Sequence, residues 1–239
     1  MQQRLKATIK RLLRPYFRAR SNRAAGLAYE RGFWDRYLRT RGDRWGADFQ
    51  ARLDPATPLS SYHRQFIDPL DDEEIHILDV GAGPLTVVGK CHPTKRIAIT
   101  AVDVLAPEYD RLLERYGIVP PVRTRYAEAE QLARIFPPDT FHLVVAQNCV
   151  DHMESPLAAI DAMLTVVRPG CWVVLDHAEN EAEREAYRGL HQWNISVRDG
   201  DFWIRGRAGE TNVTQLLSAR AEVRSYVTDH WVQVHMRKR

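Results

Sequence analysis

Short apolar runs recur along the chain from residue 71 onward, and amphipathic segments separate them. Apolar runs bounded by turn-forming residues predict β-strands. The predicted strands cover residues 75–80, 97–104, 122–126, 141–146 and 172–175. Strands that alternate with helices form βαβ units, in which the strands are parallel and the crossovers are right-handed. The pattern therefore predicts an α/β fold built on a parallel sheet.

Two helices are predicted from apolar residues that recur every three or four positions. The first covers residues 107–116 and ends at Gly117, a residue type that commonly stops helices. The second begins at Ser155-Pro156, which suit the N-cap and the first turn. Its inner stripe runs from Leu157 to Val167, and Pro169-Gly170 is expected to break it. Both helices should bury their apolar faces against the sheet.

The end of the chain predicts one more helix and a terminal hairpin. The helix covers residues 213–219, and two β-rich runs follow at 223–227 and 231–236. Two such runs joined by a short turn form an antiparallel pair, here at the edge of the sheet. Two tryptophans, Trp172 and Trp231, are predicted to lie in the core.

Three segments differ from the rest of the predicted sheet domain, which spans residues 71–239. Residues 1–23 form a basic amphipathic arm. Residues 24–70 mix aromatic and charged residues with proline breakers, which predicts a helical cap over a site. Residues 178–212 gather polar and aromatic side chains, and we predict a substrate-binding insertion there.

The basic arm carries eight Lys and Arg residues and no acid. Subtracting those eight charges from the net charge of +3 leaves −5 for the rest of the chain. A basic amphipathic helix can pack on its own domain, lie on an anionic membrane surface or bind nucleic acid. All three readings stay open, although the acidic remainder of the chain makes nucleic acid a less suitable partner.

Length and composition favour a cytoplasmic protein with one main domain. The 239 residues, 44% of them hydrophobic, suit an α/β domain with appendages. The N-terminus is too charged for a secretory signal, and no apolar run approaches the roughly 18 residues of a membrane-spanning helix. The three cysteines are far apart and form no C-x-x-C pair, which favours reduced thiols in the core.

Acids and glycines stand directly after the predicted strands, where ligands of open α/β sheets bind. The first strand leads into Asp79, Gly81 and Gly83, the second ends at Asp103, and Glu128 follows the third. Glycines let a ligand approach the backbone closely. A carboxylate in the position of Asp103 can accept both hydroxyls of a ribose. These residues together predict a nucleoside-binding site.

Five motifs carry a family resemblance in their order along the chain. They are Leu78-Asp79-Val80-Gly81-Ala82-Gly83, Ala101-Val102-Asp103, Ala127-Glu128-Ala129-Glu130-Gln131-Leu132, Phe141-His142-Leu143-Val144 and Val167-Arg168-Pro169-Gly170-Cys171. With these motifs, residues 75–177 resemble a class I S-adenosylmethionine-dependent methyltransferase of the type 11 group. The resemblance implies a Rossmann-like, mostly parallel sheet and S-adenosylmethionine as the cofactor.

The same resemblance implies roles for six residues. Gly81 and Gly83 would pass beneath the methionine moiety, and Asp79 would help to orient its amino end. Asp103 would hold the ribose hydroxyls, and Glu128 would accept from the adenine amino group. A sixth residue, Asn148, would lie near the methyl donor.

The acceptor is predicted to be a small molecule, a glycan or a glycolipid that is methylated on oxygen. A hydroxyl is a poor nucleophile and gains from a general base. Three histidines near the predicted strand ends, His152, His177 and His191, are candidates for this base, and Asp151 stands beside the first. Because methyl transfer is an in-line displacement, positioning supplies much of the remaining catalysis.

Polar and aromatic residues beyond the fifth strand resemble a lining for a hydroxyl-rich acceptor. The candidates for substrate binding are Glu179, Asn180, Tyr187, Gln192, Trp193 and Asn194. A divalent metal could be held by Asp151, Asp176, His177 and Glu179, but no tight ligand spacing requires it. We therefore predict no metal site from the sequence.

Two other classes of function remain as alternatives. A nicotinamide-dependent oxidoreductase is disfavoured by Thr86, which stands where a dinucleotide fold wants a third glycine, and by Asp79, whose charge repels a pyrophosphate. A non-catalytic module for nucleic acid or membrane could keep the same fold. The acids at three strand ends argue against a module that has lost its catalytic function.

Overall fold

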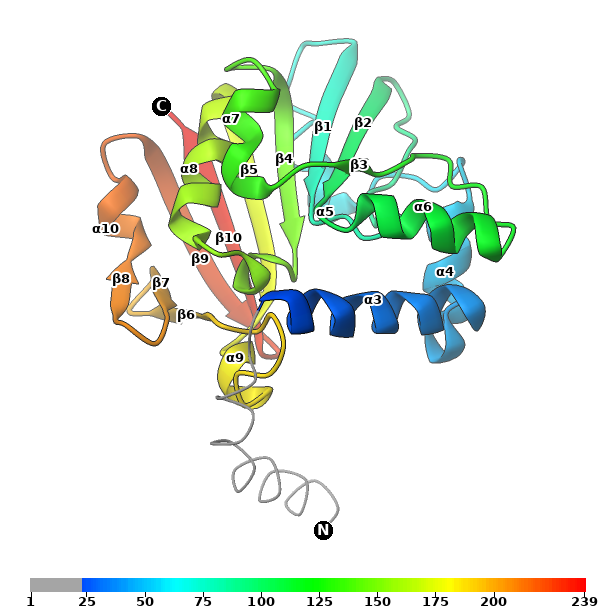
Figure 1. Cartoon of the computed structure of the whole chain (residues 1–239). Helices are drawn as coiled ribbons and strands as arrows, with labels where there is room; N and C mark the ends of the chain where they lie inside the picture. Colours follow the sequence, from blue (N-terminus) through cyan, green and yellow to red (C-terminus); the bar gives the residue numbers. More distant parts are fainter. Residues whose placement is uncertain (1–22) are drawn as a thin grey trace.

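The computed structural model describes residues 23–239, and Figure 1 shows them arranged around one large sheet. Its strands lie in the order β3-β2-β1-β4-β5-β10-β9. The bounds are β1 Glu74–Val80, β2 Arg96–Asp103, β3 Arg125–Tyr126, β4 Phe141–Gln147, β5 Val167–Ala178, β9 Ala221–Thr228 and β10 Trp231–Lys238. The first five strands are parallel, and the terminal hairpin β9–β10 joins β5 in antiparallel orientation. This arrangement confirms the predicted Rossmann-like fold with a terminal hairpin.

Helices flank this sheet, and the three predicted helices are present as α6 Ala106–Arg115, α8 Pro156–Val166 and α10 Val213–Leu217. The short helix α7 Leu132–Ile135 and the 3-10 turns η2 Ala129–Gln131 and η3 Val150–His152 complete this set. Helix α8 begins as its sequence indicates, because the Ser155 hydroxyl accepts the Ala158 N–H at 3.4 Å. The inner side of α8 packs into the main core together with β4, β5 and β10.

Four details of the sequence prediction are wrong. Val167 begins β5 instead of ending the helix, and Pro169-Gly170 lie within that strand at a shift of its register with β4. The third strand is reduced to Arg125–Tyr126. Trp231 is 39% exposed, because it lies at the start of the hairpin strand beyond the covering helices. The cysteines are free, as predicted, but Cys91 is exposed and only the other two are buried.

The segment before the sheet is helical, and its first helix lies against the carboxyl ends of the strands (Figure 1), whereas Leu59, Phe66 and Ile67 pack on a face of the sheet. It contains α3 Arg23–Arg39, η1 Asp43–Trp45, α4 Gly46–Leu53 and α5 Ser61–Arg64. In Figure 1, α3 runs across the ends of β1 and β4, next to α6. Edge-to-face contact between Trp34 and Tyr109, with ring centroids 6.1 Å apart, fixes α3 against α6. The proposed basic arm lies outside the described residues, except for Arg23.

The segment after β5 forms a second, smaller sheet. It begins with α9 Glu181–Arg184 and continues with β6 Asn194–Arg198, β7 Asp201–Arg205 and β8 Glu210–Asn212, which pair antiparallel. Ile195, Phe202 and Ile204 of this sheet are buried in the main core. Burial of these three side chains ties the segment to the domain that carries the site.

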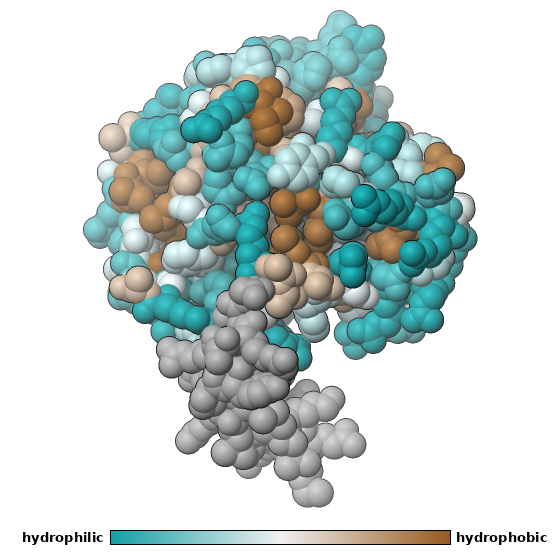
Figure 2. Space-filling model, in the orientation of Figure 1, coloured by the Kyte–Doolittle hydropathy of each residue, from teal (hydrophilic) through white to brown (hydrophobic). Residues whose placement is uncertain are grey.

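The outer surface of the described part is largely polar. Figure 2 shows that hydrophilic residues cover most of the face seen in Figure 1, with apolar residues in small separate areas. None of the described helices is both long enough and apolar enough to cross a membrane.

Candidate functional site

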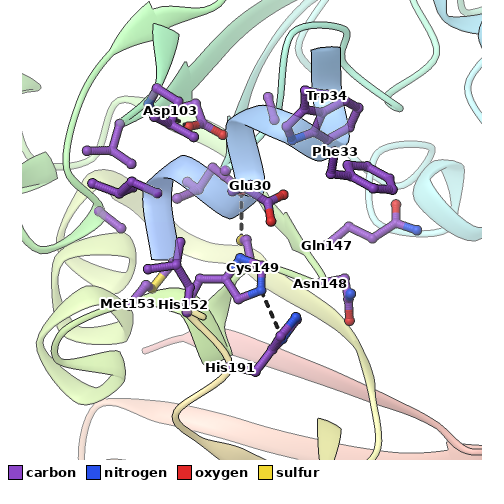
Figure 3. Close-up of a pocket in the computed structure, with 18 of the residues that line it drawn as sticks. Glu30, Phe33, Trp34, Asp103, Gln147, Asn148, Cys149, His152, Met153 and His191 are labelled. Atoms are coloured by element: carbon purple, nitrogen blue, oxygen red, sulfur yellow. Dashed lines mark hydrogen bonds between the residues drawn. The ribbon is translucent and has the colours of Figure 1, made fainter. Parts of the chain in front are cut away.

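A cavity of about 590 Å³ lies at the carboxyl ends of β1, β2 and β4. Parallel strands bring their carboxyl ends to one edge of the sheet, so residues far apart in sequence meet there. Helix α3 contributes a wall of the cavity, and the loop from Glu181 to His191 contributes another. Figure 3 shows Glu30 of α3 lying between Asp103 and His152.

The end of β1 supplies a buried acid. Asp79 is 1% exposed, and its Oδ2 accepts a hydrogen bond of 2.5 Å from the Thr86 hydroxyl. Burial raises the pKa of Asp79 to about 6, although that hydrogen bond and the nearby Arg52 lower it. Thr86 therefore supports the acid that approaches the cavity, at the position where a dinucleotide fold would carry glycine.

The two glycines after β1 are required by different neighbours. Gly81 lines the cavity with φ +68°, and a Cβ there would lie 2.5 Å from the Cβ of Cys149. Gly83, with φ +64°, packs against α3, since a Cβ there would lie 2.5 Å from the Trp34 ring. The left-handed backbone and the close contacts explain both residues. Trp34 thus covers Gly83, whereas Gly81 remains on the cavity wall.

Asp103 is held in the cavity by the loop around it. Its Oδ2 accepts from the Gly83 N–H at 3.1 Å, and its Oδ1 accepts from the Leu105 N–H at 2.8 Å. Burial raises the pKa of Asp103 to about 6 despite these two bonds. Glu30 adds a further negative charge nearby and acts in the same direction. The cavity therefore concentrates acidic groups that a positively charged ligand would stabilise.

Glu128 and Asn148 also line the cavity, at the ends of β3 and β4. The Glu128 carboxylate is 40% exposed, lies 3.7 Å from Arg23 and accepts from the Tyr126 hydroxyl at 3.3 Å. Asn148 has a left-handed backbone, with φ +48°, and its Oδ1 accepts the Ala178 N–H at 3.1 Å. This bond joins the ends of β4 and β5, so the place of Asn148 on the wall is firmly defined.

Three side chains meet at another corner of the cavity, and we call them the Asp151–His152–His191 cluster. His191 Nδ1 lies 2.7 Å from Asp151 Oδ2 and 3.1 Å from His152 Nε2. Asp151 is buried, and both histidines line the cavity, where Figure 3 shows them facing each other. Turn η3 positions the first two residues, and the loop after α9 brings the third.

The charges of this cluster support one another. Burial alone would raise the pKa of Asp151, but the imidazoles of His152 and His191 hold it below its ordinary value. Burial alone would lower the pKa of His191, but its hydrogen bond to Asp151 raises it. The arrangement favours an ionised carboxylate beside a basic imidazole, which is a group that can take up a proton.

His177 lies behind the cluster instead of on the described cavity wall. Its Nε2 accepts the backbone N–H groups of Cys149, at 3.3 Å, and Val150, at 3.0 Å. Burial lowers the pKa of His177 to about 4, so the ring is neutral and carries its proton on Nδ1. That nitrogen lies 3.9 Å from Asp151 Oδ1. His177 therefore shapes the turn that carries Asp151 and His152.

The six predicted substrate-binding residues do not line the cavity in the described part of the chain. They are Glu179, Asn180, Tyr187, Gln192, Trp193 and Asn194, and the last four make hydrogen bonds within or beside the neighbouring loop. Gln192 donates to the carbonyls of Tyr187 and Gly189, and the Trp193 indole donates to the Met153 carbonyl at 2.9 Å. Buried Asn194 accepts from the Glu183 N–H at 3.0 Å. These bonds satisfy polar groups inside the segment, so they are not free to face an acceptor.

Other residues of the same segment face the cavity instead. They are Glu181, Glu185, Arg188 and Leu190. Arg188 donates to Glu185 at 2.8 Å and to the Tyr29 hydroxyl at 3.2 Å, which joins this loop to α3. The predicted insertion thus reaches the cavity through side chains different from those expected.

The sequence interpretation also missed the cavity face of α3. Tyr29, Phe33 and four further residues of this helix line the cavity, and the four follow spacings of four, three and four: Arg23, Leu27, Glu30 and Trp34. That spacing places side chains on one helical face, and it was available from the sequence. The mixed charged, acidic and aromatic character of the face hides the pattern, because a search for apolar stripes does not detect it.

Solved structures with a similar fold are methyltransferases. The CurJ carbon methyltransferase matches with a TM-score of 0.51 at 13% identity, over 72% of this chain and 50% of that chain. The CMeT domain of the citrinin polyketide synthase matches with a TM-score of 0.52 at 17% identity, over 74% of this chain and 50% of that chain. This chain thus spans half the length of both matched chains. At these identities the likeness shows the fold alone.

The sequence match defines the family more directly. Residues 78–175 match the family model described as "Methyltransferase domain". A comparison with curated proteins gives no match. The chain therefore contains an S-adenosylmethionine-dependent methyltransferase domain, as the motifs predicted. The acidic cavity suits this positively charged cofactor, whereas it would disfavour the nicotinamide dinucleotide considered above.

We expect the affinity for the cofactor to depend on pH. The carboxyls of Asp79 and Asp103 both have pKa values raised to about 6 by burial, so they are largely protonated at pH 5 and ionised at pH 7.5. A sulfonium ligand favours the ionised forms. Binding should therefore strengthen as the pH rises, by up to about tenfold per unit for each acid below pH 6. Titration calorimetry with S-adenosylmethionine between pH 5 and 7.5 measures this, and a flat profile would contradict it.

Proposed function

We propose that this protein transfers a methyl group from S-adenosylmethionine to a hydroxyl oxygen of a small-molecule or glycan acceptor. The observation that carries the proposal is the Asp151–His152–His191 cluster on the wall of the cavity. A histidine beside a buried carboxylate suits the removal of a hydroxyl proton, because the carboxylate stabilises the imidazolium that forms. An acceptor that is already nucleophilic needs no such group.

The acids at the strand ends are the groups that would hold the cofactor. We assign the ribose hydroxyls to Asp103, the adenine amino group to Glu128 and the amino end of the methionine moiety to Asp79. Gly81 supplies a surface without a side chain, and Asn148 lines the same cavity. The raised pKa values of Asp79 and Asp103 support these roles, because a bound cation stabilises the ionised forms of such acids.

In the proposed reaction, the cofactor supplies the methyl group, and the chain positions and deprotonates the acceptor. His152 lines the cavity and takes the hydroxyl proton. The bound cofactor would supply the methyl carbon to the acceptor oxygen, and the electron pair of the broken carbon–sulfur bond would stay on sulfur. The Asp151 carboxylate, 3.6 Å from His152 Nε2, stabilises the positive charge on His152, and His177 positions the turn from behind.

Methyl transfer to a panel of acceptors tests this function. The panel contains hydroxylated small molecules, free glycans and glycolipids, with carbon acids and amines as comparison classes. We expect label from methyl-labelled S-adenosylmethionine in the hydroxyl compounds, with an O-methyl signal in the NMR spectrum of the product. A product labelled only on carbon or nitrogen would overturn the proposed O-methylation while leaving the methyltransferase assignment intact.

A further inference from the structure

The donor atoms of the Asp151–His152–His191 cluster converge on one point. Asp151 Oδ2, His191 Nδ1 and His152 Nε2 form a triangle with sides of 2.7, 3.1 and 3.6 Å. All three atoms carry lone pairs when the imidazole nitrogens are unprotonated. Among the described residues, these three side chains form a group of His and Asp whose ligand atoms lie close enough together to hold a metal ion.

Protons alone do not satisfy this triangle. His191 Nδ1 can carry one hydrogen, and the 2.7 Å distance directs it to Asp151 Oδ2. His152 Nε2 then faces a nitrogen whose hydrogen is already used. If His152 Nε2 carries a hydrogen instead, it points at the same donor nitrogen, and its distance of 3.6 Å to Asp151 Oδ2 is too long for a hydrogen bond. A single cation between the three atoms would satisfy all of them.

The size of the triangle fits a metal ion. Imidazole nitrogens and carboxylate oxygens bind Zn²⁺ at about 2.0–2.2 Å, which places neighbouring ligands roughly 3 Å apart. Two imidazoles and one carboxylate are a donor set for Zn²⁺, Fe²⁺ or Co²⁺ in preference to Mg²⁺. We propose that Asp151, His152 and His191 bind one divalent transition-metal ion, which takes the place of the shared proton.

The surroundings of the cluster support an ion at this point. Asp151 Oδ1 and His177 Nδ1 are buried, and neither has a hydrogen-bond partner in the described structure. His177 Nδ1 lies 3.9 Å from Asp151 Oδ1, so an imidazole stands directly behind the carboxylate. Glu181 has a buried oxygen, Oε2, that also lacks a hydrogen-bond partner in this part of the chain, and it lines the same cavity. Within the described part of the chain, Glu181 therefore adds an unpaired acidic oxygen to the cavity that the cluster lines.

The ion would face the acceptor side of the cavity, since both histidines lie on its wall. A coordination position left open there can be occupied by an acceptor oxygen, whose hydroxyl pKa a metal ion lowers. This role rests on the proposed function. In the metal-bound protein, activation of the hydroxyl by the ion replaces proton uptake by His152. Binding of the ion itself does not depend on the methyl-transfer reaction.

Calorimetry with Zn²⁺ and the visible absorption of added Co²⁺ test the proposal on the full chain, without cofactor or acceptor. We expect one ion per chain, weaker binding of Mg²⁺, and a Co²⁺ spectrum typical of nitrogen ligands. Asp151→Asn and His191→Ala should each weaken Zn²⁺ binding by at least about tenfold. His76→Ala is the matched control, because this exposed histidine lies at the opposite end of β1. Residues 1–22 contain no His, Cys, Asp or Glu that would compete.

Wild-type protein that binds no Zn²⁺, or binds it as tightly after both substitutions, would overturn the site. Circular dichroism of the two variants shows whether they fold. If they do not, anomalous scattering from zinc-soaked crystals of the wild type decides the matter, since the ion must lie between the three side chains. Methyl transfer without any bound ion would leave the proposed function standing, and ion binding without methyl transfer would leave the metal site standing.

Discussion

The His152→Ala variant is expected to turn over about 10²–10⁴ times more slowly than the wild type, while binding the cofactor equally well. His152 lines the cavity together with His191, and their ring nitrogens lie 3.1 Å apart. Its loss removes activation of the acceptor oxygen, either by proton uptake or by a bound ion. Steady-state kinetics with a saturating acceptor and calorimetry with S-adenosylhomocysteine measure the two effects separately.

The His76→Ala variant is the control for this prediction. It removes an exposed imidazole at the amino end of β1, away from the cavity, and should keep the turnover of the wild type. If His152→Ala retains full turnover, then the acceptor is not activated at this cluster. If it loses cofactor affinity by the same factor as turnover, then His152 contacts the cofactor instead.

The second large effect is expected for Asp103→Ala, which should weaken cofactor binding by about 10–150-fold. This range corresponds to the roughly 1.5–3 kcal/mol of a hydrogen bond to a charged group. Asp103 Oδ1 and Oδ2 already accept the Leu105 and Gly83 N–H groups, so the carboxylate is rigidly placed. Calorimetric titration with S-adenosylhomocysteine at pH 7.5, where the carboxyl is ionised, gives the affinity.

Two further variants separate the causes of such a loss. Asp103→Asn keeps a side-chain acceptor for the loop but removes the charge, so a loss shared with Asp103→Ala points to the ligand and not to the loop. Asp110→Ala removes an exposed acid of α6 that pairs with Arg123 at 2.7 Å, and it should bind normally. Unchanged affinity in both Asp103 variants would mean that another group holds the ribose.

Much of the sheet was predictable because its signals are local. The clearest case is β4, a nearly continuous apolar run, because burial on both faces demands that pattern. The helix at Pro156 was predictable from its own cap. Errors arose where a neighbour decides the outcome. Val167 extends β5 because it pairs with Phe141, and Trp231 is exposed because little packs over the start of the hairpin strand.

The residues of the candidate site also fall into two groups, those that the sequence could identify and those that only the structure could identify. Asp79, Asp103 and Glu128 could be chosen from the sequence, because each follows a strand and parallel strands end at one edge. The six predicted substrate residues could not be sorted in this manner. Their polar character is the same whether they face a ligand or bond to their own loop, and the fold directs Gln192 and Asn194 to the loop. Glu30 and Trp34 reach the cavity only because α3 crosses the strand ends.

The amino-acid sequence by itself determined the class of this protein: an α/β methyltransferase domain with acids at the ends of its strands. These features depend on short-range periodicity and on motifs that occupy consecutive positions. Only the tertiary structure decided that His191 meets Asp151, forty positions earlier, and that His177 supports the turn from behind. Such contacts depend on the packing of distant segments, and no local pattern of residues records which of their side chains turn toward each other.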